Sequence, residues 1–201
     1  MNILYIDASV RSDSRTQRLS QYFLDGFSSD NVSIKEIKLT HECIPPLTME
    51  SLEHRTELSE QGNFDEPIFH YARDYVDADM ILICAPYWDL SFPATLKTYI
   101  EAINVVGLVF MYDENGKPIG LCNAKRLVYI TTAGGEIISD DFGYGYIKEL
   151  AEKFHGIKNV DYIKAEKLDI VGADVEKILS KAEDKIDKLI TEINKECEKA
   201  E

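Results

Sequence analysis

The chain has 201 residues, 45% of them hydrophobic, and its formal net charge is −14 at pH 7. This length suits one domain, residues 1–201, with a substantial buried core. An acidic surface repels phosphate backbones and anionic headgroups, so we expect no binding of nucleic acid or membranes.

The cysteines and histidines carry no signature of a disulfide framework or a metal centre. Four of each are scattered along the chain, without a CxxC pair and without metal-ligand spacing. No apolar run approaches the length of a membrane span, and the first residues, MNILYID, are too short and too acidic for a signal peptide. We therefore expect a cytoplasmic protein with reduced thiols and no metal.

The N-terminal segment predicts a strand, a polar loop and a helix. Residues 2–7 are a short apolar run, and residues 8–16 form a polar loop. Apolar side chains then continue at helical spacing, at Leu19, Tyr22, Phe23 and Phe27. A strand that leads through a loop into a helix is the opening of a βαβ unit.

Hydroxyl and guanidinium side chains crowd this first loop and the start of its helix: Ser9, Ser12, Ser14, Thr16, Arg11, Arg15 and Arg18. Hydroxyls and free N–H groups at a helix N-terminus form an anion site, and arginines add charge-assisted donors. The pattern indicates either a phosphate monoester site or an ordinary N-cap with solvated arginines. Because the loop contains no glycine, it is neither a Walker P-loop nor a GxGxxG fingerprint.

The next segments predict an edge strand, helical structure and a central strand. Residues 32–39 alternate apolar and polar side chains, which is typical of a strand near a sheet edge. Residues 50–76 are polar with spaced apolar positions, and they predict one or two helices with a break near Gly62 and Asn63. Residues 80–84 are all apolar, which suits a strand buried on both faces of a parallel sheet.

An aromatic loop follows this central strand and consists of Pro86, Tyr87, Trp88, Asp89 and Leu90. Adjacent aromatic side chains at a loop tip are costly to expose unless a flat group covers them. They form either a ligand platform or a plug at the top of the core. The following helix opens at a second proline and has its apolar face at Leu96, Tyr99, Ile100 and Ile103.

Residues 105–121 predict a small hairpin between two short apolar pieces, with a turn at Asp113, Asn115 and Gly116. Its Phe110 and Tyr112 either cover a ligand or a partner chain, or pack locally beside the sheet.

The C-terminal part begins with a fourth strand at residues 125–131, which leads into Thr132, Ala133, Gly134 and Gly135. Paired glycines at the end of a strand either let the backbone approach a ligand closely or form a plain turn. The remaining elements are predicted as a helix, a strand and a long core-packing helix at residues 143–154, 160–165 and 173–197.

The alternation of strands and helices predicts an α/β fold, a doubly wound three-layer α/β/α domain with five parallel strands in the flavodoxin-like order 2-1-3-4-5. In this order the loops after strands one, three and four meet at one rim of the sheet. These loops would form a phosphate cup (residues 9–16), an aromatic platform (residues 86–90) and a glycine-lined wall (residues 132–136). Together they describe a site for flavin mononucleotide (FMN).

Three motifs, APYWDLSFPATLKTYIEAI, GLVFMYDENGKPIGL and ITTAGG, resemble the FMN-dependent NADH azoreductases and NAD(P)H quinone reductases of flavodoxin-like fold. The resemblance covers nearly the whole chain. It implies a homodimer with FMN in an active site at the subunit interface. It also implies ping-pong transfer of two electrons from NAD(P)H to quinones, azo compounds or nitroaromatics. No side chain is expected to be catalytic, because the chemistry takes place at flavin N5.

By position, the resemblance implies FMN contacts in all three loops. The phosphate would be held by Ser9, Ser14, Arg15 and Thr16. The isoalloxazine would pack along Pro86, Tyr87, Trp88, Asp89 and Leu90, with its pyrimidine side facing Thr132, Ala133, Gly134 and Gly135.

Two of these residues depart from the pattern of the resembled family. Asp89 stands where relatives often have asparagine, and a carboxylate close to the flavin would lower its reduction potential unless it points to solvent or is protonated. Arg15 stands where relatives often have serine or glutamine, and it should tighten phosphate binding.

The nearest alternative is a flavodoxin-like electron carrier without direct NAD(P)H oxidation. The chain length, the hairpin and the glycine-free first loop argue against it. A receiver domain of the same topology would need a carboxylate after the third strand, where Ala85 and Pro86 stand. A flavin-binding fold kept for a regulatory or structural role stays open.

Overall fold

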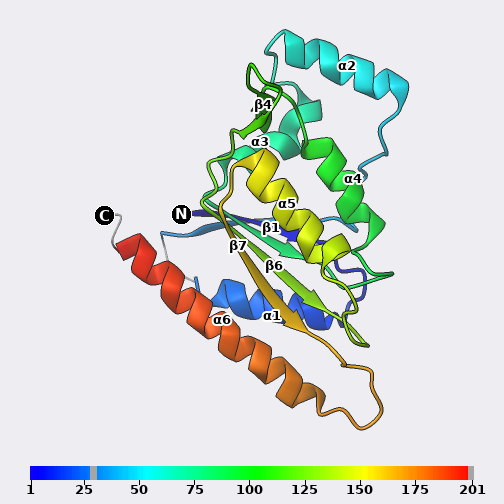
Figure 1. Cartoon of the computed structure of the whole chain (residues 1–201), viewed down its shortest axis with the longest axis vertical. Helices are drawn as coiled ribbons and strands as arrows, with labels where there is room; N and C mark the ends of the chain where they lie inside the picture. Colours follow the sequence, from blue (N-terminus) through cyan, green and yellow to red (C-terminus); the bar gives the residue numbers. More distant parts are fainter. Residues whose placement is uncertain (28–30, 199–201) are drawn as a thin grey trace.

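A five-stranded, wholly parallel β-sheet forms the centre of the computed structural model, which describes residues 1–27 and 31–198 (Figure 1). The strand order is β2-β1-β3-β6-β7, which confirms the predicted order, because β6 and β7 are the fourth and fifth strands of this sheet. The bounds are β1 (Asn2–Asp7), β2 (Ser33–Lys38), β3 (Met80–Cys84), β6 (Arg126–Thr132) and β7 (Asn159–Ala165). The all-apolar β3 is completely buried, whereas the alternating β2 lies at the edge and is largely exposed.

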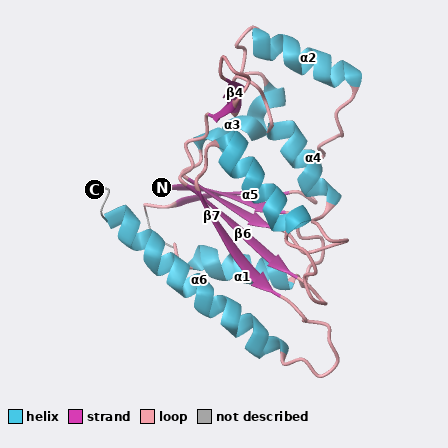
Figure 2. Ribbon diagram, in the orientation of Figure 1, coloured by secondary structure: helices cyan, strands magenta, loops and turns pink. Residues whose placement is uncertain are grey.

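Helices cover both faces of the sheet and complete a three-layer domain (Figure 2). On one face, α1 (Arg15–Asp25) and α6 (Val175–Glu198) bury Phe23 and Ile186 against the strands. The other face is covered by α3 (His70–Asp77), α4 (Ala94–Ile103) and α5 (Tyr146–Leu150), which bury Tyr75, Tyr99 and Ile147. The π-helical segments η2 (Asp141–Gly145) and η3 (Ala151–His155) extend α5 at both ends, so this helical run is slightly longer than predicted.

The segment between β2 and β3 confirms the predicted break near Gly62 and Asn63. Helix α2 (Met49–Glu60) ends just before it, and the short 3₁₀ helix η1 (Pro67–Phe69) leads into α3. None of the α2 residues is buried, and α2 stands away from the sheet (Figure 1). The predicted hairpin is also present, as the antiparallel pair β4 (Phe110–Tyr112) and β5 (Pro118–Gly120).

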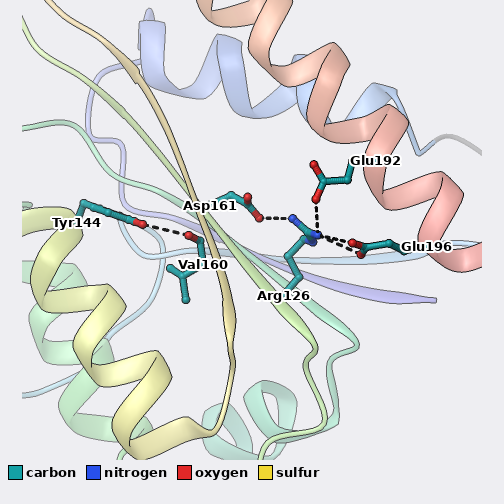
Figure 3. Close-up of polar contacts among 6 residues, drawn as sticks. All are labelled: Arg126, Tyr144, Val160, Asp161, Glu192 and Glu196. Carbon is teal, nitrogen blue, oxygen red and sulfur yellow. Dashed lines mark hydrogen bonds and ion pairs between the residues drawn. The ribbon is translucent and has the colours of Figure 1, made fainter.

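An ionic cluster fastens α6 to the amino-terminal end of β6 (Figure 3). The Arg126 guanidinium is almost fully buried and pairs with Asp161 at 2.5 Å, Glu196 at 3.0 Å and Glu192 at 3.2 Å. A buried charge is tolerated only with such partners. The cluster lies at the opposite end of β6 from Thr132, so we regard it as structural.

Within residues 1–27 and 31–198, no helix has both the length and the apolar character needed to cross a membrane. The same part of the chain contains no group of three or more His, Cys, Asp or Glu side chains arranged to hold a metal ion. All four cysteines are free.

Candidate functional site

The three predicted loops meet in one cleft of about 280 Å³ at the carboxyl end of the sheet. Parallel strands bring their carboxyl ends to the same edge, and the strand order places the loops after β1, β3 and β6 side by side there. A fourth segment, after β7, closes the remaining side. The lining comprises Val10, Arg11, Asp13, Ser14, Arg15, Thr16, Pro86, Tyr87, Trp88, Thr132, Ala133, Gly134, Leu168 and Asp169.

A buried carboxylate, Asp7, supports the first loop from below. Its Oδ1 accepts a hydrogen bond from the backbone N–H of Ser9 at 2.8 Å, and its Oδ2 accepts one from Gln17 Nε2 at 3.2 Å. Lys38 Nζ lies 3.5 Å from the same Oδ2 and offsets the charge. Asp7 therefore fixes the path of the chain between β1 and α1.

The start of α1 offers several donors to an anion. Ser14 is the N-cap, and its Oγ accepts from the backbone N–H of Gln17 at 3.2 Å, so its own hydroxyl hydrogen stays available. The first turn of α1 holds no acidic residue, and the helix dipole is positive at this end. Ser9 is buried, and its Oγ has no hydrogen-bond partner among the described residues. A buried hydroxyl without a partner is uncommon in a folded chain and points to an absent ligand.

A hydroxyl pair joins the first loop to the third. Thr16 Oγ1 and Thr132 Oγ1 lie 2.6 Å apart, and both side chains are buried. The contact holds the start of α1 against the end of β6.

The aromatic loop forms a wall of the cleft and ends in a strained turn. Trp88 and Ser91 exchange two backbone hydrogen bonds, of 3.1 and 2.8 Å, around Asp89 and Leu90. Both central residues have left-handed backbone angles, with φ of 51° and 69°, a conformation that favours glycine. Tyr87 is tied to the third loop, because its backbone N–H donates to the Thr132 carbonyl at 3.0 Å.

The thiol of Cys84 lies directly before this loop but is not a candidate nucleophile. It is completely buried, and this burial, reinforced by the Asp7 carboxylate, raises its pKa well above the usual range. Among the described residues that line the cleft there is also no histidine or cysteine. The cleft thus presents anion donors and an aromatic wall rather than a nucleophile with its base.

The third loop is held by the segment after β7. The backbone N–H groups of Lys167, Leu168 and Asp169 donate to the carbonyls of Gly135, Ala133 and Gly134, at 2.7, 3.2 and 2.8 Å. A Cβ on Gly134 would lie 2.2 Å from Asp169 Oδ2, so the glycine makes room for that carboxylate. This is a physical reason for the glycine that involves no ligand.

Most of the predicted contact residues lie on the cleft surface: Ser14, Arg15, Thr16, Pro86, Tyr87, Trp88, Thr132, Ala133 and Gly134. Ser9, Asp89, Leu90 and Gly135 belong to the same loops but do not line the cleft. Asp89 is exposed at the turn, so a direct effect of its charge inside the cleft is not supported. Of the three arginines, Arg18 faces α6 and pairs with Glu176 at 2.9 Å.

The sequence prediction missed the supporting carboxylate Asp7 and the fourth segment with Leu168 and Asp169. A polar residue at the end of an apolar strand was a usable signal for Asp7. The segment after β7 carried no comparable signal.

The chain matches the model of a protein family described as having a flavodoxin-like fold, over residues 1–190. An FMN-dependent NADH:quinone oxidoreductase 2 from Clostridium acetobutylicum is 38% identical over 186 residues, covering 88% of this chain and 92% of the relative. An FMN-dependent NADH:quinone oxidoreductase from Coprothermobacter proteolyticus is 34% identical over 189 residues, covering 90% of this chain and 93% of the relative.

The fold also agrees with solved structures. An azoreductase from Bacillus anthracis superposes with a TM-score of 0.84 at 20% identity, covering 95% of this chain and 99% of the other. An FMN-dependent NADH-azoreductase from the same species, solved in complex with FMN, gives a TM-score of 0.81 at 21% identity, with 96% and 98% covered. By the family match and the curated relatives, the chain belongs to the flavodoxin-like family that includes the FMN-dependent NADH:quinone oxidoreductases.

Proposed function

We propose that this chain is an FMN-dependent oxidoreductase that takes two electrons from NAD(P)H and passes them to quinones, azo compounds or nitroaromatics. One observation carries the proposal: an anion-binding helix start, an aromatic wall and a glycine loop converge in one cleft. The names of the relatives support FMN, NADH and a quinone acceptor, and those of the similar structures support an azo acceptor.

The residues of the cleft fit a flavin phosphate. Ser14, on the cleft surface, has a hydroxyl hydrogen to donate, and the hydroxyl of Ser9, which belongs to the same loop but lies outside the cleft lining, is buried without a partner among the described residues. Arg11 and Arg15 add positive charge to the same wall. These groups suit a phosphate monoester, which carries close to two negative charges at neutral pH.

The other two loops would hold the ring system. Tyr87 and Trp88 offer the flat apolar surface that an isoalloxazine needs. The carbonyls of Gly134 and Gly135 are occupied by the segment after β7, while within the described residues their N–H groups donate to no protein acceptor. Backbone N–H groups of this kind stabilise negative charge that develops on a bound ring.

Bound FMN would supply the redox chemistry, which requires no acid or base from the chain. The chain's part is to orient the ring and leave one of its faces accessible. We propose that a single cleft serves the donor and the acceptor in turn, which would give ping-pong kinetics.

We further propose a homodimer with the active site at the subunit interface, working in the cytoplasm. Exposed apolar side chains beside the cleft support the dimer, since Ile138 is 81% and Phe142 58% exposed. Phe142 is coupled to the aromatic turn, because its carbonyl accepts a hydrogen bond from Ser91 Oγ at 2.6 Å. The four free cysteines support a reducing compartment.

The decisive experiment is a visible spectrum of protein that has been loaded with FMN, desalted and then given NADH without air. The proposal predicts retained flavin that bleaches with NADH and recolours with a quinone. Retained flavin that NADH leaves oxidised would contradict it and favour an electron carrier. Loss of all flavin on desalting would remove the cofactor assignment itself.

The dimer is tested separately by sedimentation velocity. Wild-type protein should sediment as a dimer, and Phe142→Asp should shift it towards the monomer because a charge cannot be buried there without a partner. A wild-type monomer at micromolar concentration contradicts the proposed interface.

A further inference from the structure

An ion pair crosses the candidate flavin cleft between two residues that are 154 positions apart. Arg15, the first residue of α1, donates from Nη1 to Asp169 Oδ1 at 2.6 Å. Both residues line the cleft. The guanidinium expected to bind the flavin phosphate therefore already has a carboxylate partner.

Asp169 is held in this position by its backbone. Its N–H donates to the Gly134 carbonyl at 2.8 Å, and the neighbouring Lys167 adopts a left-handed φ of 67° and donates to Gly135. The missing side chain of Gly134 leaves the space that the carboxylate occupies. Because three consecutive backbone hydrogen bonds fix the segment, Asp169 stays at the cleft whether or not Arg15 is bound to it.

A phosphate group can compete with Asp169 for the Arg15 guanidinium. The Arg15 and Asp169 side chains are 40% and 62% exposed, and ion pairs this exposed contribute little to stability. A phosphate monoester carries more negative charge than a carboxylate and accepts two hydrogen bonds from one guanidinium. The phosphate would replace the Asp169 carboxylate as the partner of Arg15. The unpaired Asp169 carboxylate would then lie close to the phosphate, and the two negative charges would repel each other.

We propose that Asp169 sets the affinity for FMN by competing with the flavin phosphate for Arg15. This inference rests on the proposed function, since it concerns the phosphate cup of the same site. Asp169 neutralises Arg15 in the free protein and repels the phosphate in the complex, and both effects weaken FMN binding. Neither effect applies to riboflavin, which has no phosphate.

If Asp169 had the opposite role, its removal would change the FMN affinity in the opposite direction. If Asp169 served to hold Arg15 in the orientation that the phosphate needs, its removal would leave the guanidinium disordered and weaken FMN binding. A dissociation constant therefore separates the two roles without any measurement of catalysis.

The test compares the dissociation constants of FMN and riboflavin by fluorescence titration of the flavin-free protein at fixed ionic strength. Asp169→Asn keeps the shape of the side chain and removes its charge. The variant should bind FMN roughly three- to tenfold more tightly, a range that corresponds to the screened electrostatic interaction of one partly exposed charge with its neighbours. Its riboflavin affinity should stay within about twofold of wild type, because only the phosphate senses this charge.

Glu176→Gln provides a matched control. Glu176 of α6 pairs with Arg18 of α1 at 2.9 Å but lies outside the cleft, and Arg18 also pairs with Glu183 at 3.2 Å. Glu176→Gln removes one negative charge from an arginine pair that is about as exposed as the Arg15–Asp169 pair. It should change the FMN affinity by less than about twofold. An equal gain in both variants would show a general effect of net charge and overturn the proposal.

The Arg15→Gln background tests whether Asp169 acts through Arg15. Arg15→Gln alone should bind FMN less tightly, and adding Asp169→Asn should then give a smaller gain than it gives in the wild type. Unchanged or weaker FMN binding by Asp169→Asn overturns the proposal while leaving the flavin site intact. Failure of the wild-type protein to bind FMN at all overturns the proposed function together with this inference.

Discussion

Thr16 and Thr132 place their hydroxyl oxygens 2.6 Å apart, buried between α1 and the end of β6, although 116 residues separate them in the chain. Thr16 belongs to the predicted phosphate cup and Thr132 to the loop that ends in the paired glycines. The contact makes two walls of the cleft one rigid unit, so the site is largely formed before any ligand arrives.

Replacing both partners of this pair should lower the free energy of unfolding by less than the sum of the two single replacements. Thr16→Val or Thr132→Val leaves the other hydroxyl buried without a partner and should lower the free energy of unfolding by about 1 kcal/mol or more. The double variant replaces both hydroxyls by methyl groups of similar size and should cost less than the sum of the single changes. Urea unfolding of the four proteins measures the coupling, and additive costs would show that the hydrogen bond does not form.

Ser9→Ala should weaken FMN binding without lowering the free energy of unfolding of the flavin-free protein. Within the part of the chain that the structure describes, the buried Ser9 hydroxyl has no hydrogen-bond partner, so its removal should leave the flavin-free protein as stable as before or more stable by up to about 1 kcal/mol. FMN affinity should nevertheless fall roughly tenfold, because a hydrogen bond to a charged phosphate is lost. Riboflavin affinity should hardly change.

Ser20→Ala is the control for this prediction. Ser20 is also buried, but its hydroxyl donates to the Thr16 carbonyl at 3.1 Å, so its loss should lower stability. If Ser9→Ala destabilises the flavin-free protein as much as Ser20→Ala does, then Ser9 is bonded without a ligand and its assignment to the phosphate cup loses its support.

Leu90→Gly should stabilise the protein. Leu90 has a φ of 69°, which glycine adopts without strain, so the free energy of unfolding of the flavin-free variant should rise by about 0.5–1 kcal/mol after the greater entropy of unfolded glycine is counted. Leu52→Gly tests the reasoning, because Leu52 is equally exposed at 41% but lies within α2, where glycine should cost about 1 kcal/mol. Urea unfolding measures both changes in the free energy of unfolding. If both variants lose stability, the backbone at Leu90 is not strained.

The strand order and most of the cleft followed from hydrophobic patterns, because each apolar strand was marked by polar or aromatic residues at its carboxyl end. Once the order 2-1-3-4-5 was assumed, Ser14, Tyr87 and Thr132 had to lie at one edge. The pattern of α2 was less informative, because its spaced apolar residues predicted a helix but not whether it packs, and the structure buries none of them.

Asp169 shows what could not be predicted. An acidic residue in a loop after the last strand looks like any solvated turn residue in the sequence. Its role depends on a left-handed backbone at Lys167 and on the space left by Gly134, and both appear only when distant segments are packed together. Arg15 was assigned to the phosphate by its charge and by the family resemblance, and its partner in the free protein could not be foreseen.

His155 should make folding stability depend on pH. It is buried between Tyr75 and Asn104, with the Tyr75 hydroxyl 2.9 Å from Nδ1 and Asn104 Oδ1 2.9 Å from Nε2. Because the amide oxygen only accepts, Nε2 carries a hydrogen, and in the neutral imidazole Nδ1 accepts from the Tyr75 hydroxyl. Burial lowers the pKa of His155 from 6.5 to about 4.

Since the folded pKa lies below the unfolded one, the unfolded chain takes up a proton first as the pH falls. The stability that depends on neutral His155 is fully present above about pH 6.5 and is lost progressively down to about pH 4, by up to about 3 kcal/mol. Urea unfolding from pH 7.5 to 4.5 should show this loss. His155→Gln should be less stable at pH 7.5 yet lose less stability on acidification. A wild-type slope equal to that of His155→Gln would show that folding does not lower the pKa of His155.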